Sequence, residues 1–140
     1  MDYIFKEGIF WSDITSASIS ARFMPSGSLF SSVASSLFSK EHLKILLAFI
    51  NSNVANNILN VINPTLHFNP GNISTLPIAE NLKPDYSKIE IIVNKLINIA
   101  KFDWDSYETS WDFTENPIIR THQPKLEQAF NTWQQQNADA

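Results

Sequence analysis

Apolar and polar side chains alternate along the first forty residues in a way that predicts extended structure. Ile19, Ala21 and Phe23 alternate with polar residues, and a period of two is typical of a half-buried strand. Residues 25–27, with the sequence Pro-Ser-Gly, predict a turn after this strand. We therefore expect residues 1–38 to be mainly extended.

Two helices are predicted over residues 39–63, where apolar side chains recur at spacings of three and four. The first helix places these side chains on one stripe: Leu43, Leu46, Leu47 and Ile50. Ser39 is its expected N-cap. Ser52 or Asn53 is expected to begin the second helix, and Pro64 to end it, because the proline ring cannot continue the turn.

A turn and a short strand are predicted over residues 64–82. Pro70 and Gly71 suit the two central positions of a type II turn, in which the glycine takes the positive φ. Residues 76–78, Leu-Pro-Ile, are expected to form a short edge strand, because proline cannot donate to a ladder.

A long helix is predicted over residues 85–101, and a short one is expected near the end of the chain. The apolar stripe of the long helix is unbroken: Ile89, Ile92, Val93, Leu96, Ile97 and Ala100. Residues 103–140 comprise an acidic, aromatic stretch and the short helix, which is expected to begin at about Pro124. The rings of the stretch are expected to be buried and its acids solvated. The short helix is expected to bury four side chains: Leu126, Ala129, Phe130 and Trp133.

These elements together predict an α+β fold in a single domain over residues 1–140. A small mixed or antiparallel sheet from the N-terminal part would be braced by three to four helices. The composition, 44% hydrophobic and 17% charged, is ordinary for a globular protein. The absence of cysteine excludes a disulfide framework and fits a cytoplasmic protein. No membrane partner is expected, because no apolar run reaches spanning length and residues 1–6 do not form a secretory signal.

The charge and the glycines exclude several classes of function. Ten Lys and Arg against fourteen Asp and Glu give a net charge of −4, which argues against an autonomous, electrostatically driven nucleic-acid binder. The three glycines are far apart, so neither a P-loop nor a dinucleotide-binding fingerprint is present.

No catalytic or metal-binding motif is evident in the sequence. The three histidines are widely separated and have no carboxylate at ligand spacing, so no metal site is expected. No Gly-x-Ser-x-Gly elbow exists. Acid pairs occur at Asp103/Asp105 and Asp112/Glu115, but their aromatic neighbours favour a structural segment over acid–base catalysis.

Two stretches near the N-terminus resemble a known family. Residues 5–12 (FKEGIFWS) and 20–27 (SARFMPSG) resemble a region downstream of the catalytic domain in PglX, the adenine-specific DNA methyltransferases of BREX phage-defence systems. These enzymes are related to type IIG restriction-modification enzymes. The likeness continues in order over five further pieces, so that it covers roughly residues 3 to 120: residues 46–52, 63–68, 71–73, 76–78 and 103–113.

The resemblance implies a DNA target-recognition, or specificity, region with a fold similar to that of target-recognition domains. It implies that the chain is a fragment of a larger methyltransferase whose catalytic domain binds S-adenosyl-L-methionine and methylates adenine in double-stranded DNA. The fragment itself is expected to bind no cofactor and to have no catalytic residue. The Asn/Asp-Pro-Pro-Tyr/Phe loop that holds a flipped base in such enzymes is absent, since none of the Asn-Pro pairs is followed by a second proline and a ring.

Eight side chains are candidate DNA contacts. Arg22 is the only arginine in the first half of the chain, and its guanidinium suits guanine edges or phosphate. The lysines expected to contact phosphate are Lys6, Lys40 and Lys44. The side chains that could bond to bases or to the DNA backbone are Ser16, Ser18, Asn69 and Asn72.

An alternative function is a protein-interaction scaffold that docks the methyltransferase onto other defence-system components. Asparagine-rich helical faces and the acidic, aromatic tail favour this alternative. The second half of the chain carries all of the net charge of −4, which leaves it little capacity to bind phosphate. Clustering of the four N-terminal cations on one face would favour DNA, and their dispersal would favour the scaffold.

Overall fold

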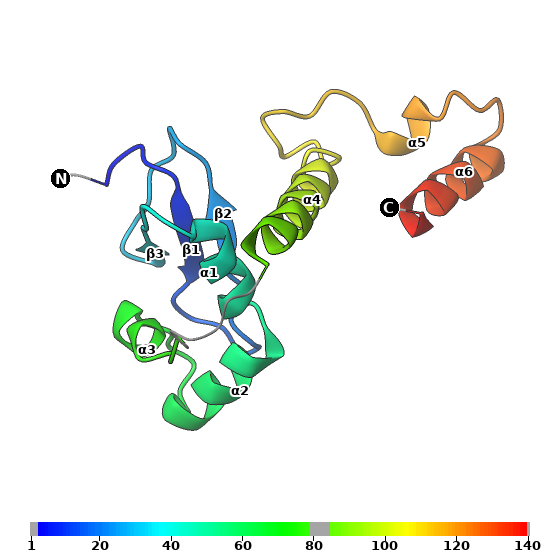
Figure 1. The fold of residues 1–140 in the computed structure, drawn as a ribbon. Coiled ribbons are helices and arrows are strands. Elements are labelled where there is room, and N and C mark those ends of the chain that lie inside the picture. The colour runs from blue at the N-terminus through cyan, green and yellow to red at the C-terminus, as the bar shows by residue number, and fades with distance from the viewer. Residues whose placement is uncertain (1–2, 79–84, 140) are drawn as a thin grey trace. The chain divides into compact units, whose positions relative to one another are not determined.

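The computed structural model describes residues 3–78 and 85–139 (Figure 1). The chain divides into two compact units, Met1–Asn94 and Lys95–Ala140. The described residues form one three-stranded antiparallel sheet and six helices. The predicted α+β class is therefore confirmed.

The sheet of the first unit has β1 (Gly8–Ser12) at its centre, between β2 (Arg22–Met24) and β3 (Ala34–Leu37). Both neighbours pair with β1 in the antiparallel sense. Ile9 and Trp11 alternate along β1 and are almost completely buried, as the period of two in a strand requires.

The strand predicted at residues 19–23 is shifted in the structure. Ile19 and Ala21 are buried as expected, but β2 begins only at Arg22, which lies opposite Phe10. The turn predicted over residues 25–27 is confirmed, since the backbone turns here and Gly27 has a φ of 90°, a conformation that glycine adopts at little cost.

The first helix of the middle region, α1 (Leu43–Ile50), is shorter than predicted. The prediction that Ser39 is its N-cap is wrong, because His42 precedes the helix in a left-handed conformation with a φ of 58°. The Ser39 hydroxyl instead donates to the carbonyl of Glu41 at 2.6 Å. Such a local hydrogen bond offers the backbone an alternative to helix.

The second helix, α2 (Asn53–Ile62), agrees with the prediction. The Ser52 side chain accepts a hydrogen bond from the amide of Ala55 at 3.2 Å, so Ser52 is the N-cap. The helix ends two residues before Pro64, with Asn63 as its C-cap.

The prediction of a type II turn at Pro70 and Gly71 is wrong. Both residues belong to the short helix α3 (Pro70–Ser74), and the Asn69 side chain caps it by accepting from the amide of Asn72 at 3.1 Å. Proline at the first helical position loses no hydrogen bond, so an Asn-Pro pair also begins helices. Residues 76–78 are not in a strand, and residues 79–82 of the predicted turn and strand lie outside the described residues.

An asparagine joins α1 to the chain before β2. The Asn51 amide donates to the carbonyl of Ala21 and accepts from its backbone amide, both at 2.9 Å, and it also donates to the carbonyl of Leu47 at 3.0 Å. The Asn51 side chain therefore supplies the two hydrogen bonds that a neighbouring strand would give to the backbone of Ala21. Ala21 is itself buried.

The predicted long helix is α4 (Tyr86–Trp104), which runs from the first unit into the second. Its existence is confirmed, and the side chain of Asp85 accepts from the amide of Lys88 at 3.0 Å at its start. Its predicted apolar stripe is largely uncovered, because Val93 is buried while Ile92 and Leu96 are exposed.

The second unit continues with α5 (Pro117–Arg120) and α6 (Leu126–Ala138). The prediction that the last helix buries four apolar side chains is wrong, since Ala129 alone of them is buried and Leu126 is 76% exposed. The prediction that the rings of the acidic stretch are buried is also wrong for Trp104, Tyr107 and Trp111, which are exposed, and the side chain of Trp111 is fully so. Phe113 is half-buried. Over residues 95–139, Ser110 and Ala129 are the only buried side chains among those described, so this unit has almost no hydrophobic core.

Among the described residues no single helix is long and apolar enough to cross a membrane. Helices α1 and α2 together have sufficient length and apolar composition, but they are bent by 65° at the break between them.

Candidate nucleic-acid interface

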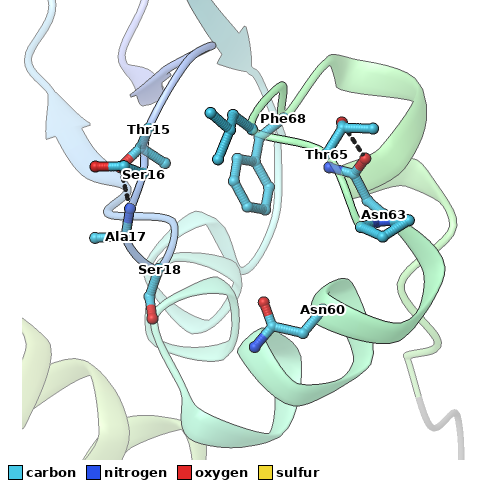
Figure 2. A pocket seen from close by; sticks show the side chains of 10 residues that line it. Thr15, Ser16, Ala17, Ser18, Asn60, Asn63, Thr65 and Phe68 are labelled. Carbon is cyan, nitrogen blue, oxygen red and sulfur yellow. Dashed lines mark hydrogen bonds between the residues drawn. The ribbon is translucent and has the colours of Figure 1, made fainter.

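A concave pocket of about 410 Å³ lies in the first unit. Figure 2 shows the loop of residues 15–18 on one side of it and the end of α2 on the other, with the chain after α2 completing the wall. The lining residues are all uncharged: Thr15, Ser16, Ala17, Ser18, Asn60, Asn63, Pro64, Thr65, Leu66 and Phe68.

Backbone pairing between two distant segments positions the pocket. The amide of Phe68 donates to the carbonyl of Asp13 at 2.7 Å, and the amide of Thr15 donates to the carbonyl of Leu66 at 3.0 Å. The indole N–H of Trp11 donates to the carbonyl of Phe68 at 2.6 Å. Both backbone polar groups of Phe68 are thereby satisfied, and its ring is held in place.

A buried asparagine shapes the wall after α2. The Asn63 side chain donates to the carbonyl of His67 at 2.7 Å and accepts from the hydroxyl of Thr65, also at 2.7 Å. The same His67 carbonyl accepts from the side chain of Asn72 at 3.1 Å. This network fixes the loop between α2 and α3 without any ligand.

The predicted polar contacts divide into two groups. Ser16 and Ser18 line the pocket and are exposed. Asn69 and Asn72 have structural partners instead, the cap of α3 and the His67 carbonyl. A role of these four residues in binding DNA stays a prediction. The hydrogen bonds of Asn69 and Asn72 already give these two side chains a structural role in the fold.

The predicted cations do not line the pocket. Arg22 is exposed on β2, and Lys6 precedes β1 with its ammonium 5.8 Å from the ring centre of Tyr3. Arg22 lies opposite Phe10 in the strand register, whereas Lys6 lies outside β1. Lys40 is exposed before α1, and Lys44 is half-buried in it.

An acid–histidine pair beside the pocket was not predicted from the sequence. The Nδ1 atom of His67 lies 3.5 Å from Oδ2 of Asp13, and Oδ1 of Asp13 is buried without a hydrogen-bond partner in the described structure. The two residues are 54 positions apart, so only the pairing of residues 13–15 with 66–68 brings them together. Among the described residues no three His, Asp or Glu side chains gather into a possible metal site.

The second unit contains a charged cluster that joins the end of α4 to the acidic loop, defined as residues 105–113 of the acidic, aromatic stretch. The Lys101 ammonium lies 2.6 Å from Oδ2 of Asp105 and 2.6 Å from Oδ2 of Asp112. The hydroxyl of Ser110 donates to Oδ1 of Asp105 at 2.7 Å. The hydrogen bonds from Lys101 and Ser110 lower the pKa of Asp105, and those to Asp105 and Asp112 raise the pKa of Lys101.

The order of this loop is expected to depend on pH at both extremes. The pKa of Asp105 is lowered in the folded chain. Its carboxylate therefore stabilises the fold fully at pH values above the ordinary pKa of an aspartate, about 4. This stabilisation is lost as the pH falls through the lowered pKa. The pKa of Lys101 is raised in the folded chain. Its ammonium therefore stabilises the fold fully at pH values below the ordinary pKa of a lysine, about 10.4. This stabilisation is lost as the pH rises through the raised pKa.

The amide shifts of Ser110 and Asp112, followed by NMR, should therefore stay constant between about pH 5 and pH 10 and change outside that range. Lys101→Met should shift both resonances at neutral pH and remove the alkaline change. An alkaline change that persists in Lys101→Met would contradict this assignment.

The chain is similar in sequence to two adenine-specific methyltransferases. It is 37% identical over 142 aligned residues to the adenine-specific methyltransferase PglX of Lacticaseibacillus casei (strain Zhang), an alignment that covers 96% of the chain. It is 35% identical over 122 aligned residues to the adenine-specific methyltransferase BrxX of Escherichia coli O9:H4 (strain HS), with 84% of the chain covered. No family model matches the chain.

The chain spans 12% of the length of the first relative and 10% of the second. The resemblance to PglX inferred from the order of the sequence pieces is thus confirmed.

Proposed function

We propose that this chain is a DNA target-recognition region of an adenine-specific DNA methyltransferase that serves phage defence or restriction-modification. The observation that carries the proposal is the 37% identity to an adenine-specific methyltransferase over 96% of the chain. In this proposal double-stranded DNA is the partner of the full-length enzyme, and the region itself performs no chemistry.

The pocket lined by residues 15–18 and 60–68 does not fit S-adenosyl-L-methionine. No charged side chain lines the pocket, whereas an acidic residue normally holds the ribose hydroxyls of an adenosine-containing cofactor. The glycines are also too far apart in the sequence for a loop that cradles such a ligand. The proposal therefore assigns cofactor binding and methyl transfer to other parts of a full-length methyltransferase.

The polar groups of the first unit suit a division of labour on DNA. The guanidinium of Arg22 and the ammonium of Lys6 are exposed beside the sheet and can neutralise phosphates. The hydroxyls of Ser16 and Ser18 are uncharged and open to solvent, and can contact base edges. Phosphate contacts position a protein on the duplex, whereas base contacts specify the sequence.

Salt-dependent binding to duplex DNA tests the proposal. Fluorescence anisotropy should show affinity falling on the order of 100-fold between about 50 and 200 mM salt, if the chain releases about four counterions. Arg22→Ala should weaken binding about tenfold, within the range typical of a lost arginine contact. Lys125→Ala, which removes an exposed cation of the second unit, is the control and should leave affinity unchanged. Absence of binding at the lower salt concentration would overturn the proposal for this chain.

A protein-interaction scaffold is the second candidate function, and the acidic loop of the second unit favours it. Trp104 at the end of α4 and Tyr107 and Trp111 after it are exposed, and Lys101 forms ion pairs with Asp105 and Asp112 beside them. Tryptophan and tyrosine dominate the binding energy of protein interfaces, and acids around them repel phosphate. The fitting partner is a protein surface with an apolar pocket and a basic rim.

A further inference from the structure

We propose that the pocket between residues 15–18 and the end of α2 binds a single unpaired nucleobase. This inference deepens the proposed function and rests on it in one respect, namely that DNA would supply the base. It assigns a ligand to a place in the fold where the sequence analysis predicted only two separate serine contacts.

The charge of the pocket restricts its ligand. All ten lining residues are neutral, so the pocket has no cation to hold a phosphate or carboxylate and no acid to hold a metal ion or an amine. A neutral ligand that both donates and accepts hydrogen bonds fits such a lining. Bases have this character, and the phosphates of a nucleotide would remain outside the pocket.

Polar side chains line the pocket on two sides. Ser16 and Ser18 belong to the loop on one side, and Asn60 projects from α2 on the other (Figure 2). In the described part of the chain none of these three side chains has a hydrogen-bond partner, whereas Asn63 and Thr65 nearby bond to each other. A carboxamide presents a donor and an acceptor side by side, which matches the edge of a base.

Apolar groups complete the surface. The ring of Phe68 lies between the two sides (Figure 2), and Leu66 and Pro64 line the pocket with it. Phe68 is only 4% exposed, so its ring forms part of the pocket floor and is not an open stacking platform. An apolar floor with polar groups at its margin suits the face of a neutral, planar ligand. The volume of about 410 Å³ lies within the range of small-molecule sites.

The pocket wall is formed before any ligand arrives. The hydrogen bonds of Phe68 to Trp11 and Asp13, and those of Asn63 to Thr65 and His67, hold its shape. A preformed wall reduces the ordering cost of binding. The free groups of Ser16, Ser18 and Asn60 are therefore available at little conformational cost.

Titration of the 140-residue chain with free nucleosides tests the inference without any phosphate present. Adenosine, guanosine, cytidine and thymidine are added to about 10 mM, because a single base has few atoms and a low affinity ceiling, and amide and side-chain NMR shifts are followed. At least one nucleoside should shift Ala17, Phe68 and the Asn60 side chain together. Ribose alone should shift none of them.

Asn60→Ala should reduce the affinity for that nucleoside at least fivefold. Asn57→Ala is the matched control, because Asn57 is also an exposed asparagine of α2 but does not line the pocket, and it should leave the affinity unchanged. Ser18→Ala and Ser20→Ala form a second matched pair, of which only Ser18 lines the pocket.

Absence of pocket shifts with all four nucleosides would overturn the inference, as would equal shifts with ribose alone. Either result leaves the proposed function standing if the chain still binds duplex DNA in a salt-dependent way. Nucleoside binding that is lost in Asn60→Ala would support the pocket even if duplex binding failed, so the two proposals can fail separately.

Discussion

Replacing Trp11 by alanine is expected to lower the free energy of unfolding of the first unit by about 4 kcal/mol, the usual range for a large aromatic side chain in a core being about 3–5. Trp11 is 1% exposed at the centre of the sheet. Its loss would leave a cavity and would leave the carbonyl of Phe68 without its donor, a cost of about 1–3 kcal/mol when a polar group stays buried. Since domains are stable by only about 5–15 kcal/mol, the substitution is expected to remove a large share of the stability of the first unit.

Urea unfolding followed by circular dichroism measures this effect. Trp111→Ala is the matched control, because it removes the same side chain from a fully exposed position, and it should change the unfolding free energy by no more than about 0.5 kcal/mol. Equal effects of the two substitutions would show that Trp11 does not lie in the core. Trp11→Phe should fall between the two, since it keeps most of the apolar contact and loses the indole donor.

Replacing Asn51 by alanine is expected to cost about 2 kcal/mol, because two backbone groups would lose their partner. The side chain of Asn51 satisfies both the amide and the carbonyl of Ala21, and Ala21 is 7% exposed. No strand takes this place in the described part of the sheet, where β2 begins one residue later. The loss should therefore also loosen the chain between Ser18 and Arg22.

The same urea experiment, with hydrogen exchange of the Ala21 amide, tests this prediction. The exchange of that amide should become faster in Asn51→Ala than expected from the change in global stability. Asn57→Ala controls for the loss of an asparagine from the helical region, since Asn57 is exposed. Unchanged protection of the Ala21 amide in Asn51→Ala would show that water replaces the side chain.

The loop before β2 connects the Asn51 substitution to the pocket. It holds Ser16 and Ser18 at the pocket, and it is fixed at one end by the pairing of Thr15 with Leu66 and at the other by Asn51. Asn51→Ala should therefore also lower the affinity of the pocket for a ligand, although Asn51 does not line the pocket.

The sequence by itself determined the elements that obey local rules. The start of α2 at Ser52 or Asn53, the long helix after Asp85 and the burial of Ile19 and Ala21 follow from the spacing of apolar residues and from capping chemistry. The structure then selects Ser52 as the cap of α2. The resemblance to PglX was also visible in the order of short pieces, because order and spacing are properties of the sequence alone.

Only the tertiary structure decided the features that depend on distant partners. Strand β3 (Ala-Ser-Ser-Leu) has no apolar alternation and exists because it pairs with β1. Pro70 and Gly71 fit a turn as well as a helix start, and the Asn69 cap selects the helix. The exposure of the tail's rings could not be predicted either, since amphipathic spacing shows which face is apolar but not whether anything covers it. The pocket arises from residues 15–18 and 60–68, which backbone pairing and the hydrogen bond from Trp11 to Phe68 bring together.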